Sequence, residues 1–177
     1  MKMRFSQKEK FPIHVSGKCL DESWLPPKLT DAWKVFLKVL REFHGESNVK
    51  AHAFVMMKNH YHWLCSYNIK EDPGYFEWFH ECLQVEFLKH GIQYIEAPFV
   101  KEISHIKFYQ NTYKYVYSNP KVAGVVLRSE DYPFSTLPYV LGKKGLPFHC
   151  IDNMNVILDP YRMLGWINGG SQLSLIH

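Results

Sequence analysis

Two histidines separated by a single residue are the part of the sequence best suited to chemistry. His60 and His62 lie in the apolar run from Phe54 to Cys65, whose composition predicts strands. Alternate residues of a strand point to the same face, and a rise of ~3.3 Å per residue places the two Cα atoms roughly 6.6 Å apart. Two imidazoles at that separation can converge on one ion, so the pair predicts a divalent metal site. Tyr61 should point the other way, into the core.

A tyrosine on a predicted helix offers a second reactive group. Helical periodicity extends from Ile106 to Asn119, where we expect Pro120 to end it. The core-facing stripe of this helix contains Ile106, Tyr109, Tyr113 and Val116. Tyr115 instead shares a face with Phe108, Thr112 and Asn119. A nucleophilic phenol and an amide oxygen that could bind a metal would then lie one turn apart, although Asn119 would serve equally well to end the helix.

Predicted strands and helices alternate around these residues. The first elements expected are a strand at Phe11–Ser16 stopped by Gly17 and a helix capped by Thr30 or Asp31 and ended by Gly45. Two strands follow, at Asn48–Met57 and His60–Tyr67, and then a helix opened by Asp72-Pro73 and ended before Gly91. A strand within Ile92–Ile106 and the tyrosine helix complete the order. This order predicts an α+β fold in which helices cover one side of an antiparallel sheet, with the histidines beginning a central strand.

Composition narrows the class of protein. The 177 residues are 46% hydrophobic, enough for the core of one domain, and the net charge of +4 with a pI near 8.8 is compatible with a polyanionic partner. The four cysteines form no paired C-x-x-C spacing, which argues against a zinc knuckle or a disulfide framework. No stretch has the length of a membrane span or a signal peptide, so we expect a cytoplasmic protein with no membrane partner.

The motifs occur in the order found in a known family. The motif His60-Tyr61-His62 is followed by Tyr115–Pro120, Ala123–Val126 and Asp131–Ser135. In this combination the chain resembles the single-tyrosine transposases of the HUH endonuclease superfamily, and among them the REP-associated tyrosine transposases. The resemblance covers roughly Phe11 to Pro138. It implies a ferredoxin-like, RRM-like domain at residues 1–140, with residues 141–177 as an extension that packs on it or trails from it.

The resemblance implies metal-dependent cleavage of single-stranded DNA. Tyr115 corresponds to the family's nucleophile, which forms a 5′-phosphotyrosine and releases a 3′-hydroxyl. His60 and His62 would hold Mg²⁺ or Mn²⁺, and Mn²⁺ also suits the preference of imidazole for transition metals. Asn119 stands where insertion-sequence relatives usually have a glutamine as third ligand. Glu102, His105 or water are the alternatives for that position.

The implied partner is single-stranded or hairpin DNA, bound by a monomer or a homodimer whose site forms within one chain or between two. Four lysines that flank the predicted site are candidates for phosphate contacts, namely Lys18, Lys58, Lys114 and Lys121. Each of them would also fit an ordinary solvated surface. Apart from His60, His62 and His105, we expect the histidines, including His14 and His52, to be structural or on the surface.

Other functions remain open at this stage. The same element order could form a non-catalytic RRM-like module that binds nucleic acid, but an RRM needs a glycine-aromatic block on a central strand, which the sequence lacks. A decayed transposase that binds DNA without cutting it is another alternative, which the presence of His60, His62 and Tyr115 disfavours. A replication initiator or relaxase would share the chemistry, but the chain has no helicase or long C-terminal extension.

Overall fold

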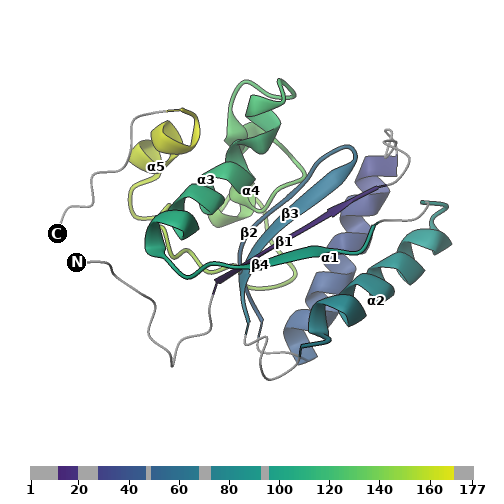
Figure 1. The fold of residues 1–177 in the computed structure, drawn as a ribbon. Helices are drawn as coiled ribbons and strands as arrows, with labels where there is room; N and C mark the ends of the chain where they lie inside the picture. Colours follow the sequence, from purple (N-terminus) through teal and green to yellow (C-terminus); the bar gives the residue numbers. More distant parts are fainter. Residues whose placement is uncertain (1–11, 20–27, 47–48, 68–72, 93–95, 170–177) are drawn as a thin grey trace.

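The computed structural model describes residues 12–19, 28–46, 49–67, 73–92 and 96–169, and leaves the side chains of residues 28 and 43–46 undescribed. Its elements are β1 (Pro12–Lys18), α1 (Lys28–Glu46), β2 (Lys50–Met56), β3 (His60–Ser66), α2 (Tyr75–Lys89), β4 (Phe99–Glu102), α3 (Ile106–Val122), the 3-10 helix η1 (Ser129–Asp131), α4 (Leu137–Val140) and α5 (Pro160–Ile167). Figure 1 shows these elements as a sheet with helices on both sides. The predicted α+β class is confirmed.

The four strands form one antiparallel sheet in the order β2-β3-β1-β4. Strand β3, which begins with His60, therefore lies between two neighbours, as predicted for a central strand. Residues directly opposite each other in the register share a face of the sheet. Ser16 pairs with His62 and Lys18 with His60, so these four residues point to the same side.

An aromatic core fills the face covered by α1 and α2. Tyr61 and Trp63 of β3 are fully buried there. The ring of Phe36 in α1 lies 4.8 Å from the ring of Tyr61, measured between centroids. The buried residues of α2 form an apolar stripe that includes Phe76, Phe79, Leu83 and Phe87. Tyr61 thus points into the core, as expected, and its neighbours His60 and His62 point away from it.

A second core lies on the opposite face, where α3 packs against β2 and β3. Ala53, Val55 and Leu64 of the sheet meet Tyr113 and Val116 of α3. The prediction placed helices on one side only, and this part of it was wrong. Both faces of the central strands carry large apolar side chains, so each face needs a cover. Figure 1 shows α3, α4 and α5 on the side opposite α1 and α2.

A β-bulge turns a histidine into this second core. The register of β2 against β3 shifts between Ala51 and Ala53, which leaves His52 as the extra residue. His52 Nδ1 lies 2.8 Å from Tyr109 Oη, and its Nε2 lies 2.8 Å from Ser66 Oγ. Burial, and secondly the positive charge of Lys50, lowers the pKa of His52 to about 4. This imidazole is neutral and structural at neutral pH.

Gly17 lies inside β1, whereas the sequence predicted that it would end the strand. It pairs with Tyr61 across β1 and β3. A Cβ atom built on Gly17 would lie 2.4 Å from the Tyr61 ring, closer than any real contact. The glycine is needed because the tyrosine ring covers its α-carbon, and this requirement is invisible without the strand pairing.

Two predicted helix boundaries were wrong. Helix α1 begins at Lys28, so Thr30 and Asp31 lie inside it and do not cap it.

Helix α3 continues through Pro120 to Val122. Its end is made by Gly124, whose φ of +71° allows Gly124 N to donate to Lys121 O and Val125 N to donate to Pro120 O. A proline near the end of a helix removes only one hydrogen bond, and the glycine decides where the helix stops. Asp72, the predicted start of α2, lies outside the described residues.

The described residues beyond 140, which end at residue 169, pack against the second core. Ile151 N donates to Ala51 O, so this segment runs beside the edge strand β2. Met163, Trp166 and Ile167 of α5 belong to the same hydrophobic cluster as α3. No helix in the described parts of the chain is both long enough and apolar enough to cross a membrane.

Candidate active site

The predicted strand histidine and the predicted helix tyrosine meet in the structure. His62 Nε2 of β3 lies 3.1 Å from Tyr115 Oη of α3. His62 is 8% exposed, while Tyr115 is 48% exposed. The hydroxyl of Tyr115 therefore contacts a buried imidazole, while about half of the Tyr115 residue is exposed to solvent. This is the geometry needed by a nucleophile that must reach a macromolecular substrate.

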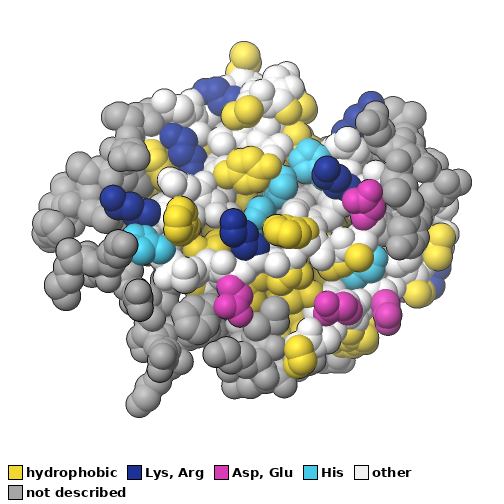
Figure 2. Space-filling view, in the orientation of Figure 1, with side chains coloured by type: hydrophobic (Ala, Val, Ile, Leu, Met, Phe, Trp, Pro, Cys, Tyr) yellow, Lys and Arg dark blue, Asp and Glu magenta, His cyan; other side chains and the backbone are white. Residues whose placement is uncertain are grey.

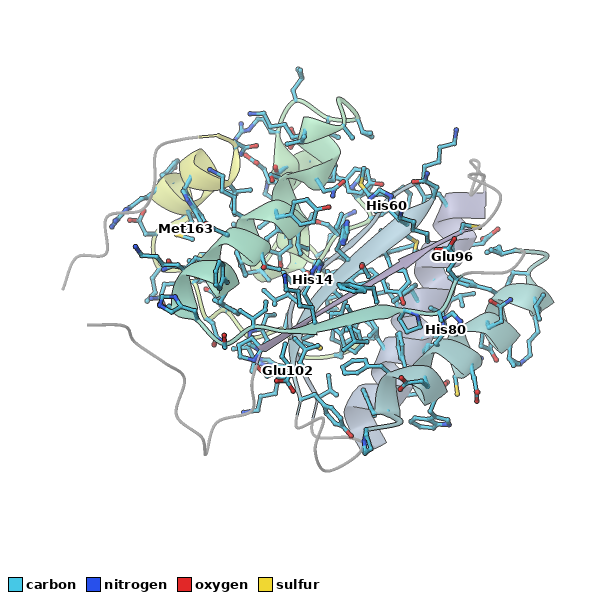
Figure 3. All side chains as sticks on the ribbon, viewed as in Figure 1. His14, His60, His80, Glu96, Glu102 and Met163 are labelled. Atoms are coloured by element: carbon cyan, nitrogen blue, oxygen red, sulfur yellow. The ribbon has the colours of Figure 1, made fainter. Side chains whose placement is uncertain are left out.

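His14 of β1 completes a chain of three polar groups. Its Nε2 atom lies 3.2 Å from His62 Nδ1. One proton assignment satisfies both contacts of His62: Tyr115 O–H donates to His62 Nε2, and His62 Nδ1–H donates to His14 Nε2. In Figure 3, His14 and His60 are labelled on the two neighbouring strands that carry them. His14 thus orients the His62 ring through the nitrogen that does not contact Tyr115.

His14 was predicted to be structural or on the surface, and this prediction missed its place in the site. The alternation of apolar and polar residues from Pro12 to Ser16 does place His14 on the polar face of a strand. That pattern does not tell which strand lies next to it. Only the pairing of β1 with β3, which are separated by more than 40 residues, brings His14 to His62.

His60 lies beside His62, with 5.0 Å between the ring centroids. His60 Nδ1 is 2.8 Å from Asn59 Oδ1, which can accept its proton. The Asn119 side chain is close enough to His60 to raise the pKa of that imidazole. Asn119 is therefore next to the histidines, and its alternative role as the end of the helix is wrong because α3 continues to Val122.

All three imidazoles of the site favour the neutral form. Burial, with smaller contributions from the charges of His14 and His60, lowers the pKa of His62 to about 3. Burial also lowers the pKa of His60, against the effect of the Asn119 side chain, which raises it. The pKa of His14 is lowered by burial first and then by the charge of Lys101. Neutral imidazole is the form that accepts a proton or binds a metal.

The other tyrosines of α3 are buried, Tyr109 and Tyr113 as the predicted core stripe required and Tyr117 in addition to it. Tyr109 and Tyr113 are at most 2% exposed, and so is Tyr117. Burial raises the pKa of each of these three phenols. Tyr115 stands apart from them because its position on the helix turns it toward the histidines. The prediction that Tyr115 lies off the core stripe is confirmed.

A pocket of about 370 Å³ opens beside Tyr115, between the end of β4 and the first turns of α3. Its lining residues are His14, Lys101, Glu102, Ile103, Ser104, Phe108, Asn111, Thr112 and Tyr115. In Figure 2, a row of histidines crosses the middle of the visible face, with lysines and hydrophobic side chains next to it. The site is thus continuous with a hollow that is lined by both polar and aromatic groups.

The four candidate lysines fall into two groups. Lys18 and Lys58 are exposed, and Lys18 is directly opposite His60 in the sheet. Lys114 lies over the Trp166 ring, with Nζ 5.4 Å from the ring centroid. Lys121 Nζ donates a hydrogen bond to Asn168 O. The first pair can meet a phosphate near the histidines, while the second pair holds α5 against α3.

The alternative third ligands lie farther from the histidines. His105 caps the start of α3, where its Nδ1 accepts from Lys107 N. Ten residues separate it from Tyr115, which is about 15 Å along a helix. Glu102 pairs with Ile13, so it leaves the sheet on the face opposite His14. Asn119 is the candidate that the fold brings to His60.

Comparisons with known proteins agree with this picture at the level of the fold. A solved structure of a REP-associated tyrosine transposase bound to a REP hairpin is similar to this chain, with a TM-score of 0.62 and 18% sequence identity. The match covers 82% of this chain and 87% of the other. No protein-family model and no curated protein sequence matches the chain. The chain therefore has the fold of the family that its motifs resemble.

Proposed function

We propose that this protein is a transposase that cleaves and rejoins single-stranded DNA through a covalent bond to Tyr115. One observation carries the proposal: the oxygen of Tyr115, a half-exposed residue, lies 3.1 Å from the Nε2 atom of a buried, neutral histidine. The shared fold with a tyrosine transposase and the order of the sequence motifs support it.

Tyr115 must lose a proton before or during attack. An unperturbed tyrosine has a pKa of ~10, so attack at neutral pH needs a proton acceptor or a nearby cation. His62, whose lowered pKa makes it a weak base, orients the Tyr115 oxygen by accepting its hydrogen bond at Nε2, and the proton passes to solvent water as that oxygen forms its bond to phosphorus. The bond from phosphorus to the 3′-oxygen breaks, and that oxygen leaves as a 3′-hydroxyl after taking up a proton. Attack by a 3′-hydroxyl on the phosphotyrosine reverses the step and joins two strands.

The donor set at the site fits a divalent metal. Among the described residues, no three or more His, Cys, Asp and Glu side chains are grouped as metal ligands. A bound Mg²⁺ or Mn²⁺ would therefore take His60, His62 and the uncharged oxygen of Asn119. Asn59 Oδ1 accepts a hydrogen bond from His60 Nδ1–H, as a residue behind a metal-binding histidine typically does. Such an ion would supply positive charge to a non-bridging phosphate oxygen.

The proposed substrate is a DNA hairpin with unpaired flanks, acted on by one chain. The similar transposase was solved with a REP hairpin, which suggests the substrate class. Tyr115 and His62 of the same chain are in contact, so a monomer can assemble the site. In this proposal residues 1–140 carry the chemistry, residues 141–177 support α3 from outside, and the protein works in the cytoplasm.

The test is a search for the covalent adduct. The full chain is incubated with Mn²⁺ and single-stranded hairpin oligonucleotides labelled at either end, then run on a denaturing gel. We expect the 3′ label to move with the protein and the 5′ label to be released, because the phosphate stays on Tyr115. Tyr115→Phe should abolish the adduct, whereas Tyr113→Phe, at a buried position two residues away, should retain it. An adduct that survives in Tyr115→Phe would overturn the proposal.

A further inference from the structure

The pocket beside Tyr115 has no role in the bond-breaking step described above. His14 and Tyr115 form part of its wall, so a molecule in the pocket touches the same tyrosine that attacks the phosphate. Its volume of about 370 Å³ is near the lower end of the range for ligand pockets, roughly 300–1,000 Å³. That space suits a single nucleotide better than a duplex or a protein segment.

The wall of the pocket has the groups that an unpaired nucleotide needs. Phe108, on the first turn of α3, is 64% exposed and presents a ring on which a base can stack. Lys101 supplies a positive charge next to His14 for a backbone phosphate. Groups that can hydrogen-bond to a base edge come from Ser104, Asn111 and Thr112.

We propose that this pocket binds one unpaired nucleotide directly next to the scissile phosphate, with its base stacked on Phe108. The proposal rests on the proposed function, because it takes the phosphate to be at Tyr115. A nucleotide joined to that phosphate reaches the pocket without crossing other protein atoms, since Tyr115 borders both.

The chain offers a matched control for Phe108. Phe99 of β4 is 65% exposed, almost the same as Phe108. It pairs with Ser16, which in turn pairs with His62, so Phe99 lies on the site face of the sheet. Phe99 does not line the pocket. Loss of Phe99 and loss of Phe108 therefore remove the same chemical group at two places near the site.

The experiment measures DNA binding without cleavage. Tyr115→Phe protein is titrated with fluorescent single-stranded hairpins that carry an abasic site at successive positions along both unpaired flanks, and Kd is read by anisotropy. We expect one position at which loss of the base weakens binding roughly tenfold, the size of one stacking contact. Adding Phe108→Ala should weaken binding of the intact hairpin by a similar factor and remove the penalty at that position. Adding Phe99→Ala should leave the penalty in place.

Two outcomes would contradict the proposal that the pocket binds a nucleotide. The first is an abasic series in which no position matters, and the second is a penalty that persists in full after Phe108→Ala. Neither outcome depends on cleavage, so both are distinct from failure of the proposed function. That failure would appear as the absence of a covalent adduct between the wild-type protein and the intact hairpin.

Discussion

Two histidine–tyrosine pairs join the sheet to α3 on the same face, and they differ in what surrounds them. In the closed pair, His52 and Tyr109 lie 2.8 Å apart and each is 2% exposed. In the open pair, His62 and Tyr115 lie 3.1 Å apart and the tyrosine is 48% exposed. The same two residue types thus hold the core together at one place and face solvent at another. Exposure of the tyrosine, rather than the pairing itself, distinguishes a candidate nucleophile from a structural residue.

The largest expected effect comes from removing the histidine of each pair. His62→Ala should reduce the rate of adduct formation by more than about 100-fold, because the Tyr115 hydroxyl loses the group that orients it and a bound metal would lose a ligand. His52→Ala should instead lower the free energy of unfolding by about 2–4 kcal/mol, since it leaves the buried Ser66 hydroxyl without its partner. Adduct gels and urea denaturation of both variants measure the two effects. The comparison fails if His52→Ala, while folded, loses cleavage and His62→Ala keeps it.

The closed pair should also make stability depend on pH. The pKa of His52 is about 4 in the folded protein, against ~6.5 in an unfolded chain. Below pH 6.5 the unfolded chain takes up a proton that the folded protein refuses, so stability is full above that pH and declines as pH falls toward 4. The contribution lost between pH 7.5 and pH 5 is about 2 kcal/mol.

Urea denaturation at these two pH values, in the presence of a chelator, measures this effect. His52→Gln keeps a polar side chain that does not titrate, so its loss of stability between the two pH values should be smaller than that of the wild type. His62, whose pKa is about 3, still contributes in the same direction. Equal losses in the wild type and in His52→Gln would show that the closed pair does not carry the pH dependence.

The smallest expected effect concerns His14. This histidine contacts His62 of the open pair. His14→Leu removes the acceptor of His62 Nδ1–H and should weaken Mn²⁺ binding by about tenfold, as the loss of an outer partner does at other metal sites. His14→Gln restores an acceptor oxygen and should recover most of the affinity. Titration of free Mn²⁺ by electron paramagnetic resonance gives the dissociation constants. A leucine variant with wild-type affinity would assign His14 to packing alone.

Local patterns in the sequence were enough to find the open pair. Alternation along a strand places His60 and His62 together, and the 100° rotation per residue of a helix turns Tyr115 away from Tyr109 and Tyr113. Both inferences use neighbours within a few residues. The fold class was predictable for the same reason, since the order of strands and helices can be read along the chain.

What the sequence could not supply depends on contacts between distant segments. His14 joins the site only through the pairing of β1 with β3, and His52 enters the core only through a bulge in β2. Lys114 and Lys121 fit a DNA-facing helix by position, yet both contact α5 or the residue that follows it. Local propensity also wrongly predicted that α3 ends at Pro120, because Gly124 sets the end of this helix.

The absence of a side chain at Gly17 determines the register of β1 against β3, and thereby the positions of the site residues. A slip of β1 along β3 must cover two residues if each side chain is to keep its face. Either slip would bring a residue with a Cβ, Val15 or Cys19, under the ring of Tyr61, where the present contact leaves no room. The only register that fits the aromatic core on one face is therefore the one that sets His14 next to His62 on the other. A residue that has no side chain and touches no substrate determines which histidines can act together.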